Sequence, residues 1–168
     1  EKLSVSVLTV SDTRGLEDDL GGALIVELLT GAGHSIAERI IVKDDIPEIQ
    51  AAVQKALASG EADAIVLTGG TGVAPRDVTP DALAPILERE LPGFGELFRM
   101  LSYEEIGTPA MLSRAMAGVI GETLVFALPG SRGAIRTAVE RIILPELGHL
   151  VSLANPQKAK HSHKPDKA

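Results

Sequence analysis

Residues 64–80 constrain the fold most, because an apolar run there leads into a glycine-rich loop and then into a helix start. Residues 64–67 are apolar, with two β-branched side chains among them, which is typical of a strand buried on both faces of a parallel sheet. The glycines of residues 69–72 allow positive φ angles and let a ligand approach bare backbone. Residues 79–81, Thr-Pro-Asp, predict an N-cap, a proline at the first helical position and an acid in the first turn. The stretch therefore predicts a strand, a loop and a helix, with the loop at the edge where open α/β sheets bind ligands.

The loop carries more polar chemistry than a tight turn needs, in the side chains of Thr68, Thr71, Arg76 and Asp77. A simple glycine turn is the alternative interpretation of the glycines. For Arg76, an ion pair with Asp77 or contact with a helix end competes evenly with binding an anion. The loop lacks the lysine of a P-loop and the G-x-G-x-x-G spacing of a dinucleotide fingerprint.

Strands and helices are predicted to alternate along most of the chain. Strands at residues 3–11, 35–42 and 62–67 are separated by helices at 20–29 and 47–58, and they are followed by helices at 80–89 and 94–106, a hairpin at 117–128, and helices at 134–144 and 145–153. This alternation predicts an α/β fold with a three-layer, doubly wound, mostly parallel sheet and helices on both faces. We expect one domain, residues 1–154, and a flexible tail, residues 155–168, which has no apolar pattern.

Polar residues follow four predicted strands, and the exits of parallel strands meet at one edge of the sheet. They lie at residues 11–12, 43–45, 68–77 and 129–133. Helix N-termini after such turns favour phosphate. A carboxylate there would hold Mg²⁺ or accept the adjacent N–H donors of a pterin, and Asp44 and Asp77 suit either task. Asp45 and Asp19 are more simply helix caps, and Ser131 is a helix cap or a phosphate donor.

Composition excludes several classes of function. The net charge of −7 and an aromatic content of 2% argue against a nucleic-acid surface. The absence of cysteine excludes disulfides and thiolate zinc sites. The sequence contains no apolar run of membrane-spanning length and no recognisable signal peptide, so we expect a cytoplasmic protein without a membrane partner.

Several motifs together resemble the MogA/MoaB family of molybdenum-cofactor proteins, which includes the G domain of gephyrin. The residues that carry this resemblance are 68–72 (TGGTG), 75–80 (PRDVTP), 11–12 (SD), 91–93 (LPG), 112–114 (LSR) and 128–131 (LPGS). Residues 98–107 (FRMLSYEEIG) look like the MoaB branch in particular. The resemblance covers roughly residues 3–153.

The resemblance implies molybdopterin adenylyltransferase activity, with molybdopterin and ATP as substrates and Mg²⁺ as cofactor. In that reaction the phosphate of molybdopterin attacks the α-phosphorus of ATP and pyrophosphate leaves. The two important aspartates of the family fall on Asp77, for metal or phosphate positioning, and on Asp44, for molybdopterin or metal. The remaining substrate- and nucleotide-binding positions implied are Ser11, Asp12, Thr68, Gly69, Gly70, Thr71, Gly72, Arg76, Gly130 and Ser131.

The chain departs from the family at two positions, because Lys43 precedes Asp44 where a proline is frequent, and Arg132 follows Ser131 where a proline is frequent. The MoaB branch also includes members that bind the pterin without clear catalysis. A molybdopterin-binding or delivery protein is therefore the alternative, and a general nucleotide-binding module is a third hypothesis. The resemblance further implies a homotrimer or homohexamer, in which Phe94, Phe98 and Met100 would supply either an interface or core.

Overall fold

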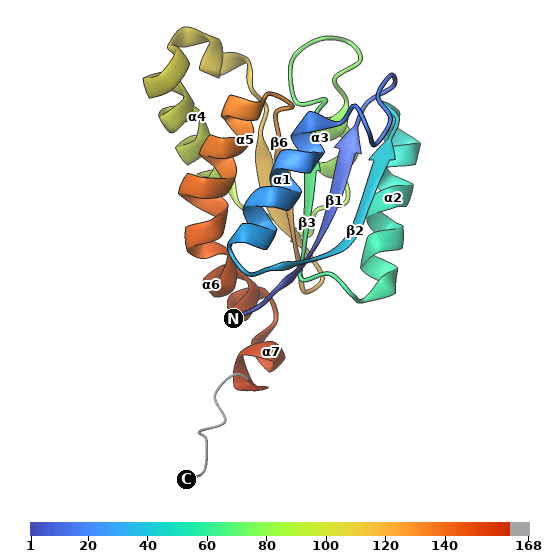
Figure 1. Cartoon of the computed structure of the whole chain (residues 1–168), viewed down its shortest axis with the longest axis vertical. Helices are drawn as coiled ribbons and strands as arrows, with labels where there is room; N and C mark the ends of the chain where they lie inside the picture. Colours follow the sequence, from blue (N-terminus) through green and yellow to red (C-terminus); the bar gives the residue numbers. More distant parts are fainter. Residues whose placement is uncertain (162–168) are drawn as a thin grey trace.

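A computed structural model describes residues 1–161, which form one six-stranded sheet with helices on both faces (Figure 1). The strand order is β2-β1-β3-β6-β5-β4, with β2, β1, β3 and β6 parallel and with β5 and β4 added antiparallel at one edge. The strands are β1 Ser4–Val10, β2 Ser35–Val42, β3 Ala64–Thr68, β4 Arg89–Glu90, β5 Met116–Ile120 and β6 Thr123–Leu128. The predicted mostly parallel, doubly wound sheet is confirmed.

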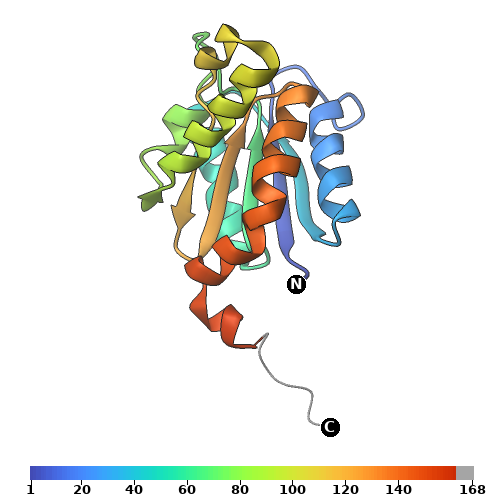
Figure 2. The same ribbon diagram turned by 90° about the vertical axis from the view of Figure 1, so that its left-hand side faces the viewer.

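The helices lie in two layers (Figure 2). Helices α1, α4, α5 and α6 cover one face, and α2 and α3 cover the other. Their bounds are α1 Leu20–Gly31, α2 Ile46–Ser59, α3 Thr79–Leu83, α4 Pro92–Ile106, α5 Arg132–Ala138, α6 Leu144–Ala154 and α7 Pro156–His161, with a 3₁₀ helix η1 at Thr108–Leu112 and a π-helix η2 at Val139–Ile143.

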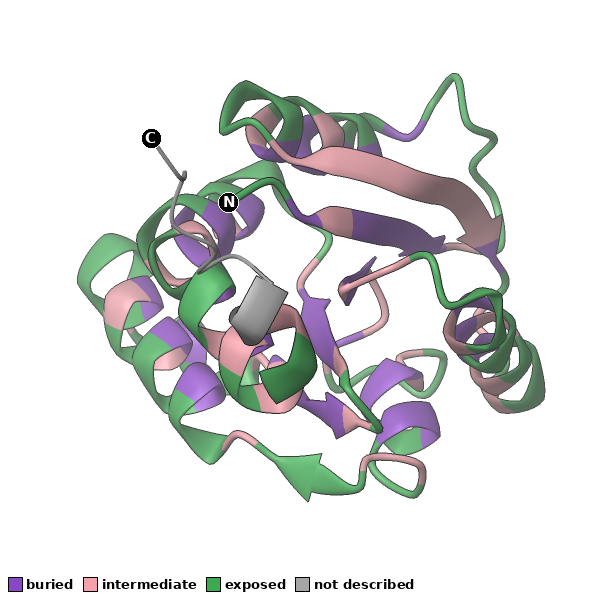
Figure 3. Cartoon of the chain, turned by 90° about the horizontal axis from the view of Figure 1, so that it is seen from below, coloured by how far each residue is buried: buried purple, intermediate pink, exposed green. Residues whose placement is uncertain are grey.

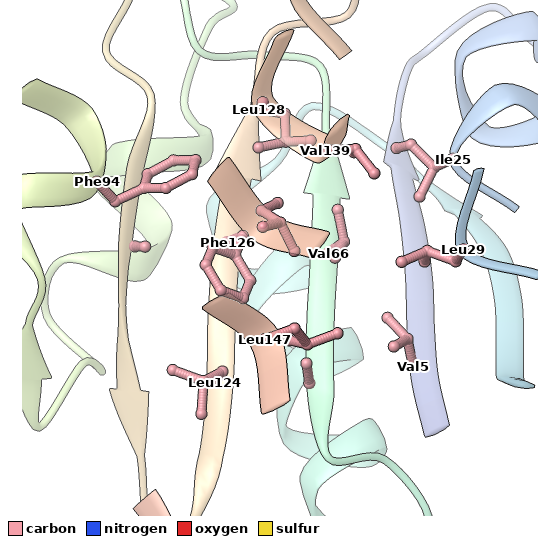
Figure 4. Packing of buried hydrophobic residues seen from close by; sticks show 14 of the residues in the cluster. Val5, Ile25, Leu29, Val66, Phe94, Leu124, Phe126, Leu128, Val139 and Leu147 are labelled. Carbon is pink, nitrogen blue, oxygen red and sulfur yellow. The ribbon is translucent and has the colours of Figure 1, made fainter. Parts of the chain in front are cut away.

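The central strands are buried, as their colour in Figure 3 shows. Their side chains alternate between two apolar cores, one on each face of the sheet. In β3, for example, Ala64 and Val66 belong to one core, and Ile65 and Leu67 belong to the other. Figure 4 shows the core beneath α1, α5 and α6, where the Phe94 and Phe126 rings meet edge to face with centroids 5.4 Å apart. Because both faces are covered, a ligand can reach this sheet only at a strand end.

The helix predicted at residues 80–89 is much shorter than expected, because α3 ends at Leu83. Pro85 has no backbone N–H with which to continue the helix. Residues 89–90 pair instead with β5 as the edge strand β4. The predicted N-cap is also wrong, because Val78 holds that position without a side-chain cap, while the Thr79 hydroxyl donates to the Gly69 carbonyl at 2.8 Å.

Two helices predicted at 134–144 and 145–153 are continuous in the structure, since α5 passes through the π-helix η2 into α6. A π-helical turn beside Pro145 accommodates the missing N–H of the proline. The tail expected from residue 155 onward begins with a helix, α7, at residues 156–161. The Asn155 side chain there accepts from the amide of Lys158, and the Lys158 ammonium pairs with Asp63. Residues 162–168 of the predicted tail lie outside the described residues.

Candidate functional site

A polar cleft of about 360 Å³ opens at the carboxyl ends of the parallel strands. Figure 1 shows these strand ends at the top of the sheet, where the arrowheads of β1 and β3 meet the loops that follow them. β1 is the strand at which the connections reverse direction across the sheet, so this is the position at which doubly wound folds bind ligands. The cleft is lined by Thr9, Val10, Ser11, Asp12, Thr13, Arg14, Asp19, Gly21, Asp44, Thr68, Gly69, Gly70, Arg76, Asp77, Gly130 and Ser131.

Gly69 allows three strand exits to meet at the base of the cleft. Its φ is +97°, and a Cβ atom there would lie 2.5 Å from the Val10 carbonyl oxygen at the end of β1. Its amide donates to the Leu128 carbonyl at the end of β6, at 3.0 Å. Any side chain at this position would push these backbones apart, so the glycine is required by packing as well as by its torsion angle.

Gly70 brings bare backbone next to a carboxylate from another loop. Its φ is +68°, and a Cβ atom there would lie 2.5 Å from the Thr79 hydroxyl and 3.2 Å from Oδ1 of Asp44. The loop after β3 and the loop after β2 are therefore in contact. The glycine keeps the path between this backbone and the Asp44 carboxylate open.

Four aspartates line this cleft: Asp12, Asp44 and Asp77 come from three different loops, and Asp19 lies at the start of α1. The pKa of Asp44 is raised, first because the group is partly buried and then by the charge of Asp12, with a smaller contribution from Asp77. A hydrogen bond from the backbone of Asp12 and the charge of Arg76 act on this pKa in the opposite direction. Four aspartates but only two arginines, Arg14 and Arg76, line the cleft, so negative charge exceeds positive charge there.

The Asp77 carboxylate is fixed by its own loop. Its Oδ2 accepts from the amide of Ala74 at 3.0 Å, and the Asp77 amide donates back to the Ala74 carbonyl at 2.9 Å. A Cβ atom on Gly72 would lie 2.7 Å from the same carboxylate oxygen. The closed turn, with a glycine beside it, sets where this charge lies.

The floor of the cleft contains a carboxylate that we expected only as a helix cap. Asp19 is buried, caps α1 through the amide of Gly22, and accepts from the Thr9 hydroxyl at 2.6 Å. Arg39, on β2, pairs with it at 3.4 Å. A Cβ atom on Gly22 would lie 2.1 Å from Oδ2 of Asp19, so the helix can approach the carboxylate only through a glycine.

The structure brings most of the predicted site residues into this one cleft. Those that line it are Ser11, Asp12, Asp44, Thr68, Gly69, Gly70, Arg76, Asp77, Gly130 and Ser131. Thr71 and Gly72 do not line it. Thr71 is buried, and the carbonyls of both residues point away to accept hydrogen bonds from Arg114.

The structure shows the local contacts of three residues for which the sequence left alternatives open. Asp45 caps α2 by accepting from Glu48, and Ser131 caps α5 by accepting from Ala134 while it also lines the cleft. Arg76 is exposed at the cleft and makes no hydrogen bond or ion pair with the residues that the structure describes, so it is free to meet an anion.

The sequence did not single out Thr9, Val10, Thr13, Arg14 and Gly21 as lining residues, and it gave Asp19 only as a cap. Thr9, Val10, Thr13 and Arg14 lie at the exit of the first predicted strand, around Ser11 and Asp12, which the sequence analysis did name. That position was the one signal in the sequence that they line the cleft.

The carboxylates suit a cation that brings its own oxygen ligands from a substrate. Among residues 1–161 no cluster of three or more His, Cys, Asp or Glu side chains could enclose a metal ion by itself. Mg²⁺ usually takes only one or two carboxylates together with phosphate oxygens and water. Asp44 and Asp77, which line the same cleft, fit that requirement.

Comparison with known proteins shows which family the chain resembles. A family model described as "Probable molybdopterin binding domain" matches residues 6–149. The chain is 52% identical over 146 residues to molybdenum cofactor biosynthesis protein B of Bacillus subtilis, covering 86% of each. It is 48% identical over 143 residues to the protein of that name from Escherichia coli K12, covering 85% of this chain and 84% of the relative.

Solved structures show the same fold. A crystal structure of molybdenum cofactor biosynthesis protein B matches with a TM-score of 0.91 and 47% identity, covering 93% of this chain and 98% of the other. The tungsten cofactor synthesizing protein MoaB of Pyrococcus furiosus matches with a TM-score of 0.84 and 41% identity, covering 92% and 98%. No helix within the described residues is long and apolar enough to cross a membrane. From its sequence, its fold and these relatives, the chain belongs to the MogA/MoaB family of molybdenum cofactor biosynthesis proteins.

Proposed function

We propose that this chain binds molybdopterin and ATP in the cleft and joins them. A phosphate oxygen of molybdopterin attacks the α-phosphorus of ATP, the bond from the α-phosphorus to the bridging oxygen breaks, and adenylylated molybdopterin and pyrophosphate are formed. The observation that carries the proposal is that Asp44, Asp77 and the Gly69–Gly70 backbone line one cavity. Family membership supplies the substrate class.

The cleft offers the groups that phosphoryl chemistry needs. Such a reaction is accelerated chiefly by positioning and by neutralising charge on the phosphate oxygens. Arg76 and Arg14 bring cations to the cleft, and bare backbone at Gly70 lets a phosphate approach closely. Asp44 and Asp77 would hold Mg²⁺, which when bound supplies positive charge to the phosphates of ATP.

The experiment incubates the purified protein with molybdopterin and Mg-ATP and follows adenylylated molybdopterin by mass spectrometry. Asp77→Asn is the sharpest variant, because the amide oxygen of asparagine can still accept from Ala74 while the charge is lost. We expect the rate to fall about a hundredfold or more, the usual scale for removing a preorganised electrostatic group. Asp45→Asn is the matched control, since Asp45 lies at the same end of the sheet but only caps α2, and asparagine caps as well as aspartate.

The same assay separates the proposal from the alternative of a pterin-binding or delivery protein. A delivery protein would bind molybdopterin, measured by titration calorimetry, and yield no adenylylated product at saturating Mg-ATP. In a delivery protein, the closed turn that holds Asp77 would serve pterin binding alone. Pterin binding without product would therefore reject the transferase and keep the binding function.

We further propose that another copy of this chain covers the outer face of α4 and η1. Phe94 and Phe98 are buried in the core, so they do not serve this role, whereas Met100 is exposed. Six large apolar side chains on α4 and η1 are at least 48% exposed: Leu97, Met100, Tyr103, Ile106, Met111 and Leu112. An apolar face of this kind is typical of an interface between subunits.

A further inference from the structure

One arginine outside the cleft holds the whole loop that carries Asp77. Arg114 lies between η1 and β5, far from the loop in sequence. Its Nε donates to the Gly72 carbonyl at 2.8 Å and its Nη2 donates to the Asp77 carbonyl at 2.6 Å. Its backbone amide donates to the Thr71 carbonyl at 2.8 Å. The two ends of the turn at residues 72–77 are thus tied to one guanidinium.

The remaining donor of this arginine extends the attachment into the next helix. Nη1 of Arg114 contacts both carboxylate oxygens of Asp81, on α3, at 3.2 and 3.1 Å. A planar guanidinium presents its donors in a fixed fork, so contacts to Gly72, Asp77 and Asp81 together define the orientation of the loop relative to α3. A lysine ammonium could meet one of these acceptors but could not span all three.

Arg114 is itself held in place from the opposite side. Arg99, on α4, donates through Nη1 to the carbonyls of Ser113 at 3.4 Å and Ala115 at 3.0 Å. These residues flank Arg114 in the chain. The backbone on both sides of Arg114 is therefore held in place, which restricts the positions that its guanidinium can occupy.

We propose that Arg114 is a positioning residue for the Asp77 carboxylate, acting through the backbone of residues 72–77 rather than by contact with substrate. It does not line the cleft. The carbonyls of Gly72 and Asp77 are fixed by it, and between them the amide of Ala74 fixes the carboxylate. The expected effect of Arg114 on kcat rests on the proposed adenylyl transfer. Its effect on the structure of the turn does not.

The structural test needs no substrate. In Arg114→Gln, amide hydrogen exchange at Asp77 and Thr79, which donate to Ala74 and Gly70, should speed up about tenfold or more because the turn opens locally. The amide of Leu124, which donates to Asp63 at the other end of the sheet, should keep its wild-type rate in a folded variant. Unchanged exchange at Asp77 and Thr79 would overturn the inference, whether or not the protein is a transferase.

The kinetic test separates positioning from general stability. A misplacement of about 1 Å at a reacting group can cost about a hundredfold, so Arg114→Gln should lower kcat by about that factor while KM for molybdopterin changes less than about threefold. Arg114→Lys should recover only a small part of the loss. Asp81→Asn is the matched control, because it weakens one contact of Arg114 and leaves those to Gly72 and Asp77, so kcat should stay within about threefold of wild type.

The variants distinguish positioning through the turn from other roles of Arg114. An equal loss of kcat in Asp81→Asn and Arg114→Gln would reject positioning through the turn, as would full recovery in Arg114→Lys. A wild-type protein that makes no product would reject the proposed transfer, while the exchange measurement would still decide the role of Arg114.

Discussion

The carboxylate of Asp12 accepts a hydrogen bond from the backbone amide of Asp44, at 2.9 Å, although the two side chains carry like charges. The contact joins the loop after β1 to the loop after β2 at the mouth of the cleft. It places the Asp12 charge where it raises the pKa of Asp44.

Replacing Asp12 by asparagine should therefore lower the pKa of Asp44 towards its ordinary value. Asparagine keeps an oxygen that can accept from the Asp44 amide, so the loops stay joined while the charge disappears. Carbon-detected NMR titration of the Asp44 carboxyl would measure the change. An equal or higher pKa in Asp12→Asn would contradict the assigned cause.

Asp44 itself should reduce stability at neutral pH. Because the pKa of Asp44 is raised in the folded protein, its contribution to stability is full below the unfolded value, near 3.8, and is lost as the pH rises through the folded value. Asp44→Asn, which never ionises, should unfold at a higher temperature than wild type at pH 7. The advantage should disappear as the pH falls below the unfolded pKa. Thermal unfolding across a pH series tests this, and an advantage that grows towards low pH would reverse the sign.

Gly69→Ala should cost more than Gly33→Ala, because the two glycines share a similar positive φ, +97° and +92°, but differ in their surroundings. A Cβ atom on Gly33 meets nothing within 4 Å, whereas one on Gly69 meets the Val10 carbonyl oxygen at 2.5 Å. Strain from the torsion angle is common to both, so the difference reports the clash, about 1–3 kcal/mol in the free energy of unfolding. Chemical denaturation of the two variants measures it. Equal costs would show that the strand exits can separate freely.

Asp19→Ala should destabilise the protein more than Asp45→Ala, although both aspartates cap helices. Loss of the exposed cap at Asp45 should cost about 1 kcal/mol. Loss of Asp19 also strips partners from the Thr9 hydroxyl and from Arg39, and breaking a buried pair on one side typically costs about 3–5 kcal/mol. Arg39 retains some contact with water, so we expect the lower end of that range. Urea unfolding at pH 7 compares the two, and similar costs would mean that the Asp19 network adds nothing beyond capping.

Met100→Glu should weaken self-association if a second copy covers the α4 face, because a carboxylate would be buried against apolar side chains. Leu153→Glu is the control, since Leu153 is also a large exposed apolar residue but lies on α6. Sedimentation velocity should show a smaller assembly for Met100→Glu and an unchanged one for Leu153→Glu. A wild-type monomer, or equal effects of the two changes, would show that this face is not an interface between copies of the chain.

The sequence by itself determined the parallel sheet and the end of it that carries the site. Strands such as residues 64–67 are apolar on both faces, which only a doubly covered sheet can bury, and the glycines that follow mark a loop open to a ligand. Their positions at strand exits placed Asp44 and Asp77 at that edge, the family resemblance then singled them out, and both line the cleft. Local patterns suffice here because burial and turn chemistry act between near neighbours in the chain.

Only the tertiary structure decided which groups support those aspartates. Arg114 lies more than thirty residues from Asp77, and Arg39 lies twenty from Asp19, so no local pattern could pair them. That residues 89–90 form an edge strand, where a helix was predicted, depended on β5 offering them a partner. Such contacts arise when distant segments are brought together by core packing, and their energies depend on burial and geometry that a linear pattern does not contain.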